Sequence, residues 1–155
     1  MGKAVDPALR QLLKRGGDFD PLTGLDLVSA AAKEQGLGWY VADCDKARSR
    51  SAVFRAIVKA VDYPQFFGSD FDGLFDCLRD TLQDQKDGGF VLVLDRLHSA
   101  DPAIVMDGHQ FLQVLNDTVT YARDNGMVFI YGIHHAGKHA DDKPGVVHSW
   151  SDEPS

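Results

Sequence analysis

Two nearly continuous apolar runs place the tightest limits on how this chain can fold. They cover residues 89–95 (GFVLVLD) and 127–133 (MVFIYGI). Runs of this kind are typical of strands buried on both faces, as in a parallel sheet. Between them, apolar residues recur at helical spacing over residues 109–124, and Asn125-Gly126 ends the pattern. Because parallel strands need a crossover connection, the runs predict a parallel pair joined through that helix.

The residues before these runs extend the same pattern. Residues 38–43 (GWYVAD) predict another strand, and residues 49–61 and 70–85 have the apolar periodicity of helices. The resulting order is strand, helix, helix, strand, helix, strand. It predicts an α/β fold, a small three-stranded parallel sheet flanked by helices.

Two extra helices are expected at the N-terminus. The pattern favours helices at residues 8–15 and 24–35, with Thr23 as a possible N-cap of the second and residues 18–23 as a turn. The last part of the chain is polar and has little periodicity. We therefore divide the chain into an N-terminal helical extension at 1–36, a main domain at 37–133 and a mobile tail at 134–155.

The net charge limits the kind of partner, and the cysteine content indicates the cellular compartment. The net charge is −7 with histidine neutral, which disfavours nucleic acid and anionic membranes and favours a basic partner. The start of the chain lacks the apolar core of a signal peptide, and no apolar run reaches the roughly 20 residues that span a bilayer. Cys44 and Cys77 do not form a cysteine-rich framework. We expect a cytoplasmic protein with free thiols and no cofactor.

The segment from residue 63 to 78 (YPQFFGSDFDGLFDCL) is the most informative for function. Ser69 is placed to cap the helix that follows. Aspartates four residues apart share one side of a helix, and this spacing links Asp72, Asp76, Asp80 and Asp84. Most of the net charge of the chain gathers around this row.

Aromatic residues accompany the acidic row. Tyr63, Phe66 and Phe67 belong to a loop that contains proline and glycine. Aromatic anchors beside carboxylates are typical of protein–protein interfaces. Gly73, between two carboxylates, would let a partner approach closely. The alternative interpretation is that the acidic helix face is ordinary solvated surface.

This segment resembles the barstar family. The family pattern runs Pro, polar, aromatic, aromatic, Gly, two polar residues, apolar, Asp, small, Leu, aromatic, Asp, Cys, Leu. The chain matches it from Pro64 to Leu78 as PQFFGSDFDGLFDCL. The resemblance extends over residues 37–133 and implies a barstar-like fold. It also implies a function: an inhibitor, or immunity protein, that covers the active site of a basic, barnase-like ribonuclease.

The resemblance also implies roles for single residues. Asp76 would be the central carboxylate in the pocket where the enzyme holds phosphate, Asp72 a second charged contact, and Phe66 a ring stacked at the rim. Asp70 and Phe75 fall where the family often has Asn and Trp. The expected partner-binding set is Phe66, Phe67, Gly68, Asp70, Asp72, Gly73, Phe75, Asp76 and Asp80.

Two departures from the family pattern concern the contacts with the enzyme. Phe66 and Phe67 lack the hydroxyl groups of the usual tyrosine pair. A late acidic contact of the family has no clean match, with Asp117, Asp124 and Tyr121 as candidates for its place. The partner is therefore expected to be a barnase-like ribonuclease or a related basic toxin.

The sequence also contains residues compatible with other chemistry. His134, His135 and His139, followed by Asp141 and Asp142, have a spacing compatible with a metal site, but a solvated tail is the simpler reading. Cys44 or Cys77 beside His98 or His109 would suggest a nucleophile, yet a buried inert thiol is the simpler reading for Cys77. Asp72 with Asp76 has no accompanying cleft motif for acid–base catalysis. Asp95 and Arg96 predict an ion pair at the end of a strand.

We therefore expect no catalytic residues and no metal site. The alternative function is a regulatory or enzyme-like α/β domain that inhibits nothing.

Overall fold

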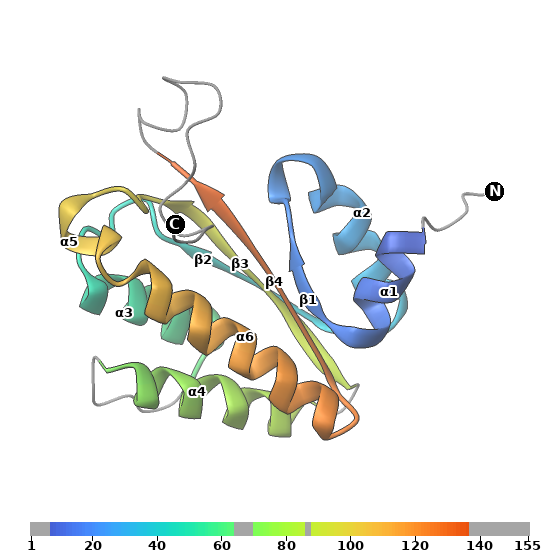
Figure 1. Cartoon of the computed structure of the whole chain (residues 1–155). Coiled ribbons are helices and arrows are strands. Elements are labelled where there is room, and N and C mark those ends of the chain that lie inside the picture. The colour runs from blue at the N-terminus through green and yellow to red at the C-terminus, as the bar shows by residue number, and fades with distance from the viewer. Residues whose placement is uncertain (1–6, 64–69, 86–87, 137–155) are drawn as a thin grey trace.

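The computed structural model describes residues 7–63, 70–85 and 88–136. These residues form one parallel sheet with helices on both faces (Figure 1). In chain order the elements are α1 (Pro7–Arg15), β1 (Gly17–Phe19), α2 (Pro21–Glu34), β2 (Gly38–Asp43), α3 (Arg50–Ala60), α4 (Phe71–Asp84), β3 (Gly89–Leu97), α5 (Pro102–Val105), α6 (Gly108–Asp124) and β4 (Val128–His135). The α/β class predicted from the sequence is confirmed.

The sheet has four strands, so the prediction of three was wrong. Its order is β1-β4-β3-β2, and every neighbouring pair is parallel. The added strand, β1, lies where we expected a turn. It pairs Gly17 with Ile130 and Phe19 with Gly132. A strand of three residues is too short to leave a periodic pattern in the sequence.

A glycine lets this extra strand approach the sheet. Gly16, just before β1, has a φ of +78°, and a Cβ atom there would lie 2.4 Å from the carbonyl oxygen of Phe129. A positive φ and a close backbone approach both favour glycine. A side chain at this position would therefore push β1 away from β4.

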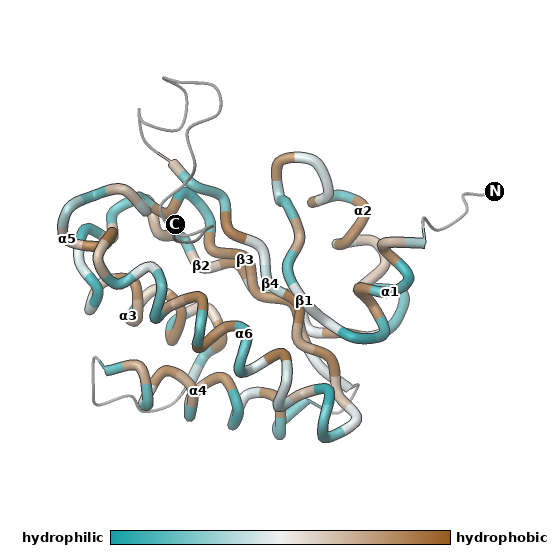
Figure 2. Tube along the Cα trace, in the orientation of Figure 1, coloured by the Kyte–Doolittle hydropathy of each residue, from teal (hydrophilic) through white to brown (hydrophobic). Residues whose placement is uncertain are grey.

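The two faces of the sheet bury separate apolar clusters. Phe90, Leu92, Leu94 and Phe129 lie in the larger cluster with residues of α3, α4 and α6. The side chains that alternate with them, namely Val91, Val93 and Ile130, lie in a second cluster with residues of α1 and α2. Figure 1 shows α1 and α2 on the opposite side of the sheet from α3, α4 and α6. Figure 2 shows hydrophobic residues following the central strands. The prediction that 89–95 is buried on both faces is confirmed for residues 89–94.

Several element boundaries differ from the predictions. Helix α2 begins earlier than expected, because the carboxylate of Asp20 caps it by accepting from the Leu22 amide at 3.0 Å, so Thr23 is not its N-cap. The short helix α5 was not predicted, since four residues carry no periodic signal. His134 and His135, expected in the tail, are the last two residues of β4.

Candidate protein-binding surface on helix α4

Helix α4 is anchored by its apolar side. Its buried residues are Leu74, Cys77, Leu78, Thr81 and Leu82. The ring of Phe71 packs edge-on against Phe54 of α3 and Phe111 of α6. The apolar periodicity that predicted a helix over residues 70–85 is thus the buried side of α4. Because this side is held against the core, the opposite side is presented in a fixed orientation.

The N-terminus of α4 is capped by Asp70. The Asp70 carboxylate accepts a hydrogen bond from the Gly73 amide at 2.9 Å. The expectation that Ser69 would be the N-cap is therefore wrong, and Ser69 itself lies outside the described residues. A carboxylate at this position satisfies an otherwise free amide and favours the positive end of the helix dipole. Asp70, one of the predicted binding residues, thus has a structural role in the free protein.

Asp76 and Asp80 lie at the centre of the outward side, with Arg79 between them. The Arg79 guanidinium is 3.2 Å from a carboxylate oxygen of Asp76 and 3.5 Å from one of Asp80. The Asp76 side chain is 55% exposed, against 39% for Asp80. Asp72 is also exposed, one turn before Asp76. The predicted row of carboxylates is therefore present, and Asp76 is open to a partner.

Tyr63 binds the second of these carboxylates. Its hydroxyl group donates a hydrogen bond of 2.7 Å to the other carboxylate oxygen of Asp80. This bond raises the pKa of Tyr63 to about 12, because deprotonation would place a phenolate beside a carboxylate. Asp80 is thus engaged from within the chain on both of its oxygens. The sequence did not reveal this contact, because the two residues are 17 positions apart.

Phe75 joins the surface of α4 to that of α6. Its half-buried ring packs edge-on against Tyr121, with 6.2 Å between ring centres. The amide of Gln83 donates a hydrogen bond of 2.6 Å to the Tyr121 hydroxyl. Tyr121, Asp117 and Asp124 all lie on α6, which packs beside α4. Phe75 and Tyr121 therefore link the surfaces of α4 and α6, and Asp117 and Asp124 are exposed on α6.

The remaining predicted residues divide into two groups. Gly73 is half-buried in the first turn of α4, where its amide completes the cap. Phe66, Phe67 and Gly68 lie outside the described residues.

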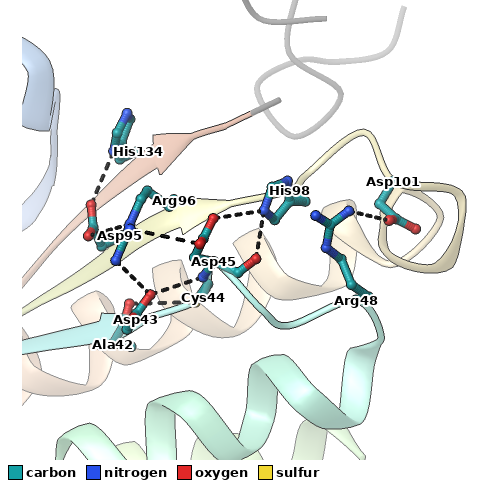
Figure 3. Close-up of polar contacts among 10 residues, drawn as sticks. All are labelled: Ala42, Asp43, Cys44, Asp45, Arg48, Asp95, Arg96, His98, Asp101 and His134. Carbon is teal, nitrogen blue, oxygen red and sulfur yellow. Dashed lines mark hydrogen bonds and ion pairs between the residues drawn. The ribbon is translucent and has the colours of Figure 1, made fainter. Parts of the chain in front are cut away.

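A second polar cluster lies where β2 and β3 end (Figure 3). The Arg96 guanidinium contacts three carboxylates, at 3.0 Å to Asp43, 3.8 Å to Asp45 and 3.2 Å to Asp95. The predicted Asp95–Arg96 ion pair is confirmed. Carboxyl ends of parallel strands often hold ligands, but here the three carboxylates share one guanidinium, which links the end of β2 to β3.

Histidines complete this cluster. His134 Nδ1 lies 3.1 Å from an Asp95 oxygen, and His98 Nε2 lies 2.8 Å from the Asp45 carbonyl oxygen. His135 Nδ1 lies 2.6 Å from the Ser99 hydroxyl. Among residues 7–63, 70–85 and 88–136, no group of three or more His, Cys, Asp or Glu side chains could hold a metal ion.

Both thiols are buried and unpaired. Burial raises the pKa of Cys44 and of Cys77 to about 12. A thiol of that pKa is protonated near neutral pH and is a poor nucleophile. Cys77 is fully buried on the inner side of α4, as predicted.

No helix within the described part of the chain is long and apolar enough to cross a membrane.

Fold and surface together define the class of protein. It is an α/β protein with an all-parallel sheet, helices on both faces and one amphipathic acidic helix with a half-exposed outer side. The model of a family described as Barstar (barnase inhibitor) matches residues 39–134. The chain belongs to the barstar family. The match runs from β2 to β4 and leaves out α1, β1 and α2. A search of the curated proteins finds no match.

Proposed function

We propose that this protein is an inhibitor that binds a basic, barnase-like ribonuclease and covers its active site with the outward side of α4. The observation that carries this proposal is the exposed Asp76 carboxylate at the centre of a rigidly anchored acidic helix. A ribonuclease must concentrate positive charge where it holds phosphate. A carboxylate presented there can accept hydrogen bonds from the same positively charged groups that hold the phosphate.

The charge pattern also suits rapid encounter with such an enzyme. The described stretch 70–85 holds five aspartates and one arginine. Complementary charge accelerates association at low salt, and the effect is screened as ionic strength rises. We further propose that the protein has no catalytic activity of its own and acts in the cytoplasm as an immunity protein, where the nuclease would otherwise attack cellular RNA.

The decisive test compares two substitutions on α4. Asp76→Ala removes the central carboxylate, whereas Asp84→Ala removes the same charge two turns further along the helix. We expect Asp76→Ala to weaken inhibition of a barnase-type ribonuclease by about 2–5 kcal/mol, a range set by complexes of this same family and not obtained from the present geometry. Asp84→Ala should change it no more than about threefold, the effect of a charge at the rim.

Folding must be checked beside inhibition. Asp76 is exposed, so its substitution should leave the free energy of unfolding, measured by urea denaturation, within about 0.5 kcal/mol of the wild type. If both variants inhibit as well as the wild type, α4 is not the binding surface. If the wild-type protein does not inhibit the ribonuclease at all, there are two remaining possibilities. Either the partner is another basic toxin, or the protein is a regulatory or enzyme-like domain that inhibits nothing.

A further inference from the structure

Arg79 is the only cation in the sequence of residues 70–85, and it lies between the two central carboxylates. We propose that Arg79 is an internal counter-ion, which the cation of a partner must displace from Asp76, and that it thereby limits which basic proteins bind. The inference rests on the proposed function and adds a specificity-determining residue to that same surface.

The geometry places Arg79 in direct competition with a partner. Its guanidinium lies 3.2 Å from the Asp76 carboxylate, the group that would enter the phosphate pocket of the enzyme. A second guanidinium arriving at Asp76 would meet a like charge at close range. Two like charges about 6 Å apart change an equilibrium constant roughly 3-fold at the dielectric constant of bulk water, and more where the site is partly desolvated. Arg79 therefore weakens binding to a pocket lined only by cations.

The structure also provides a place for Arg79 once it has been displaced. One oxygen of Asp80 lies 3.5 Å from Arg79, while the hydroxyl of Tyr63 holds the other. The guanidinium carbon lies 6.0 Å from the centre of the Phe75 ring, within the range of a cation–π contact. Arg79 can release Asp76 and remain on Asp80 and the ring. Asp80 thus acts within the chain, as the partner that retains Arg79.

The substitution Arg79→Gln tests this role, with Arg10→Gln as the matched control. Arg10 is exposed on α1, on the opposite face of the sheet, and its loss changes the net charge equally. Against a barnase-type ribonuclease, we expect Arg79→Gln to bind roughly 3- to 10-fold more tightly than Arg10→Gln. Arg79→Lys retains the charge and should restore affinity close to that of the wild type.

A cationic probe gives a readout that does not depend on the enzyme. Binding of a tetra-arginine peptide is followed through the carboxylate carbon resonance of Asp76 in the full chain. We expect the peptide to bind Arg79→Gln more tightly than Arg10→Gln. If the wild-type protein does not inhibit the ribonuclease but the peptide still binds Arg79→Gln more tightly, the proposed enzyme partner is rejected. The role of Arg79 as a counter-ion is then retained.

Two outcomes of these binding experiments would overturn the inference. Equal binding of the peptide to the two variants would overturn the inference, because the gain would then reflect net charge alone. Weaker ribonuclease binding by Arg79→Gln, with inhibition by the wild type intact, would also overturn it and would make Arg79 a favourable contact with the enzyme.

Discussion

At the scale of single residues, Arg96 shows how one unusual backbone angle organises a cluster. Its φ is +53°, in the left-handed region that non-glycine residues rarely adopt. It lies at the irregularity in the β3–β4 pairing between Leu94 and Leu97. This conformation directs the guanidinium across the strand ends to the carboxylates of Asp43 and Asp45. The charge contacts favour this arrangement, whereas the left-handed backbone disfavours it.

Two substitutions separate these opposing effects at Arg96. Both Arg96→Ala and Arg96→Gly remove the guanidinium, but only glycine relieves the left-handed backbone. We expect the glycine variant to be more stable than the alanine variant by about 1 kcal/mol. Urea denaturation of the two proteins measures the difference. A more stable alanine variant would mean that any strain in the backbone here is smaller than the conformational entropy that glycine gains in the unfolded state.

At the scale of the element, α4 depends on its first residues as much as on its core. Asp70 satisfies the Gly73 amide from outside the helix. We expect Asp70→Ala to destabilise the protein by about 1 kcal/mol. Asp70→Asn retains an oxygen acceptor and should stay within about 0.5 kcal/mol of the wild type. Thermal unfolding of both variants provides the comparison.

Inhibition assays on the same two variants address the second role predicted for Asp70. If its contribution is only the cap, Asp70→Asn inhibits the ribonuclease within about threefold of the wild type, a factor typical of a rim charge. A much larger loss would show that the carboxylate also meets the partner.

Elements with long apolar patterns were predictable, and short ones were not. The strands that became β3 and β4 and the helix that became α6 could be placed within a few residues, because their buried positions repeat regularly. Strand β1 and helix α5 were missed because each has too few residues to form a pattern. The inner and outer sides of α4 followed from spacing. The contact of Tyr63 with Asp80 did not, because it depends on how the chain returns in space.

At the scale of the whole molecule, the N-terminal segment completes a layer. Leu13 of α1 and Val28 of α2 lie in the same buried cluster as Val91, Val93 and Ile130 of the sheet. Without this layer, one face of β3 and β4 would lose its apolar cover. The segment expected as a separate extension therefore shares a core with the sheet, and we propose that it folds together with the main domain.

A pair of leucine substitutions tests this cooperation. Leu13 is buried, so Leu13→Ala should destabilise the whole protein by about 2–4 kcal/mol. Leu22, which is 73% exposed on α2, is the control, and its replacement by alanine should cost less than about 0.5 kcal/mol. Urea unfolding followed by far-ultraviolet circular dichroism reports the stability of the whole chain. A separate early transition for Leu13→Ala, with the main transition unmoved, would show that the extension folds on its own.

The separation of the two sides of α4 has a consequence for how such a protein changes over generations. The residues that hold the helix in place, such as Leu74 and Leu78, are distinct from those it presents outward, such as Asp72 and Asp76. Mutations on the outward side alter surface charge at little cost in folding stability. The outward side of the helix can therefore change its binding specificity through single substitutions, while the buried residues that hold the helix in place stay the same.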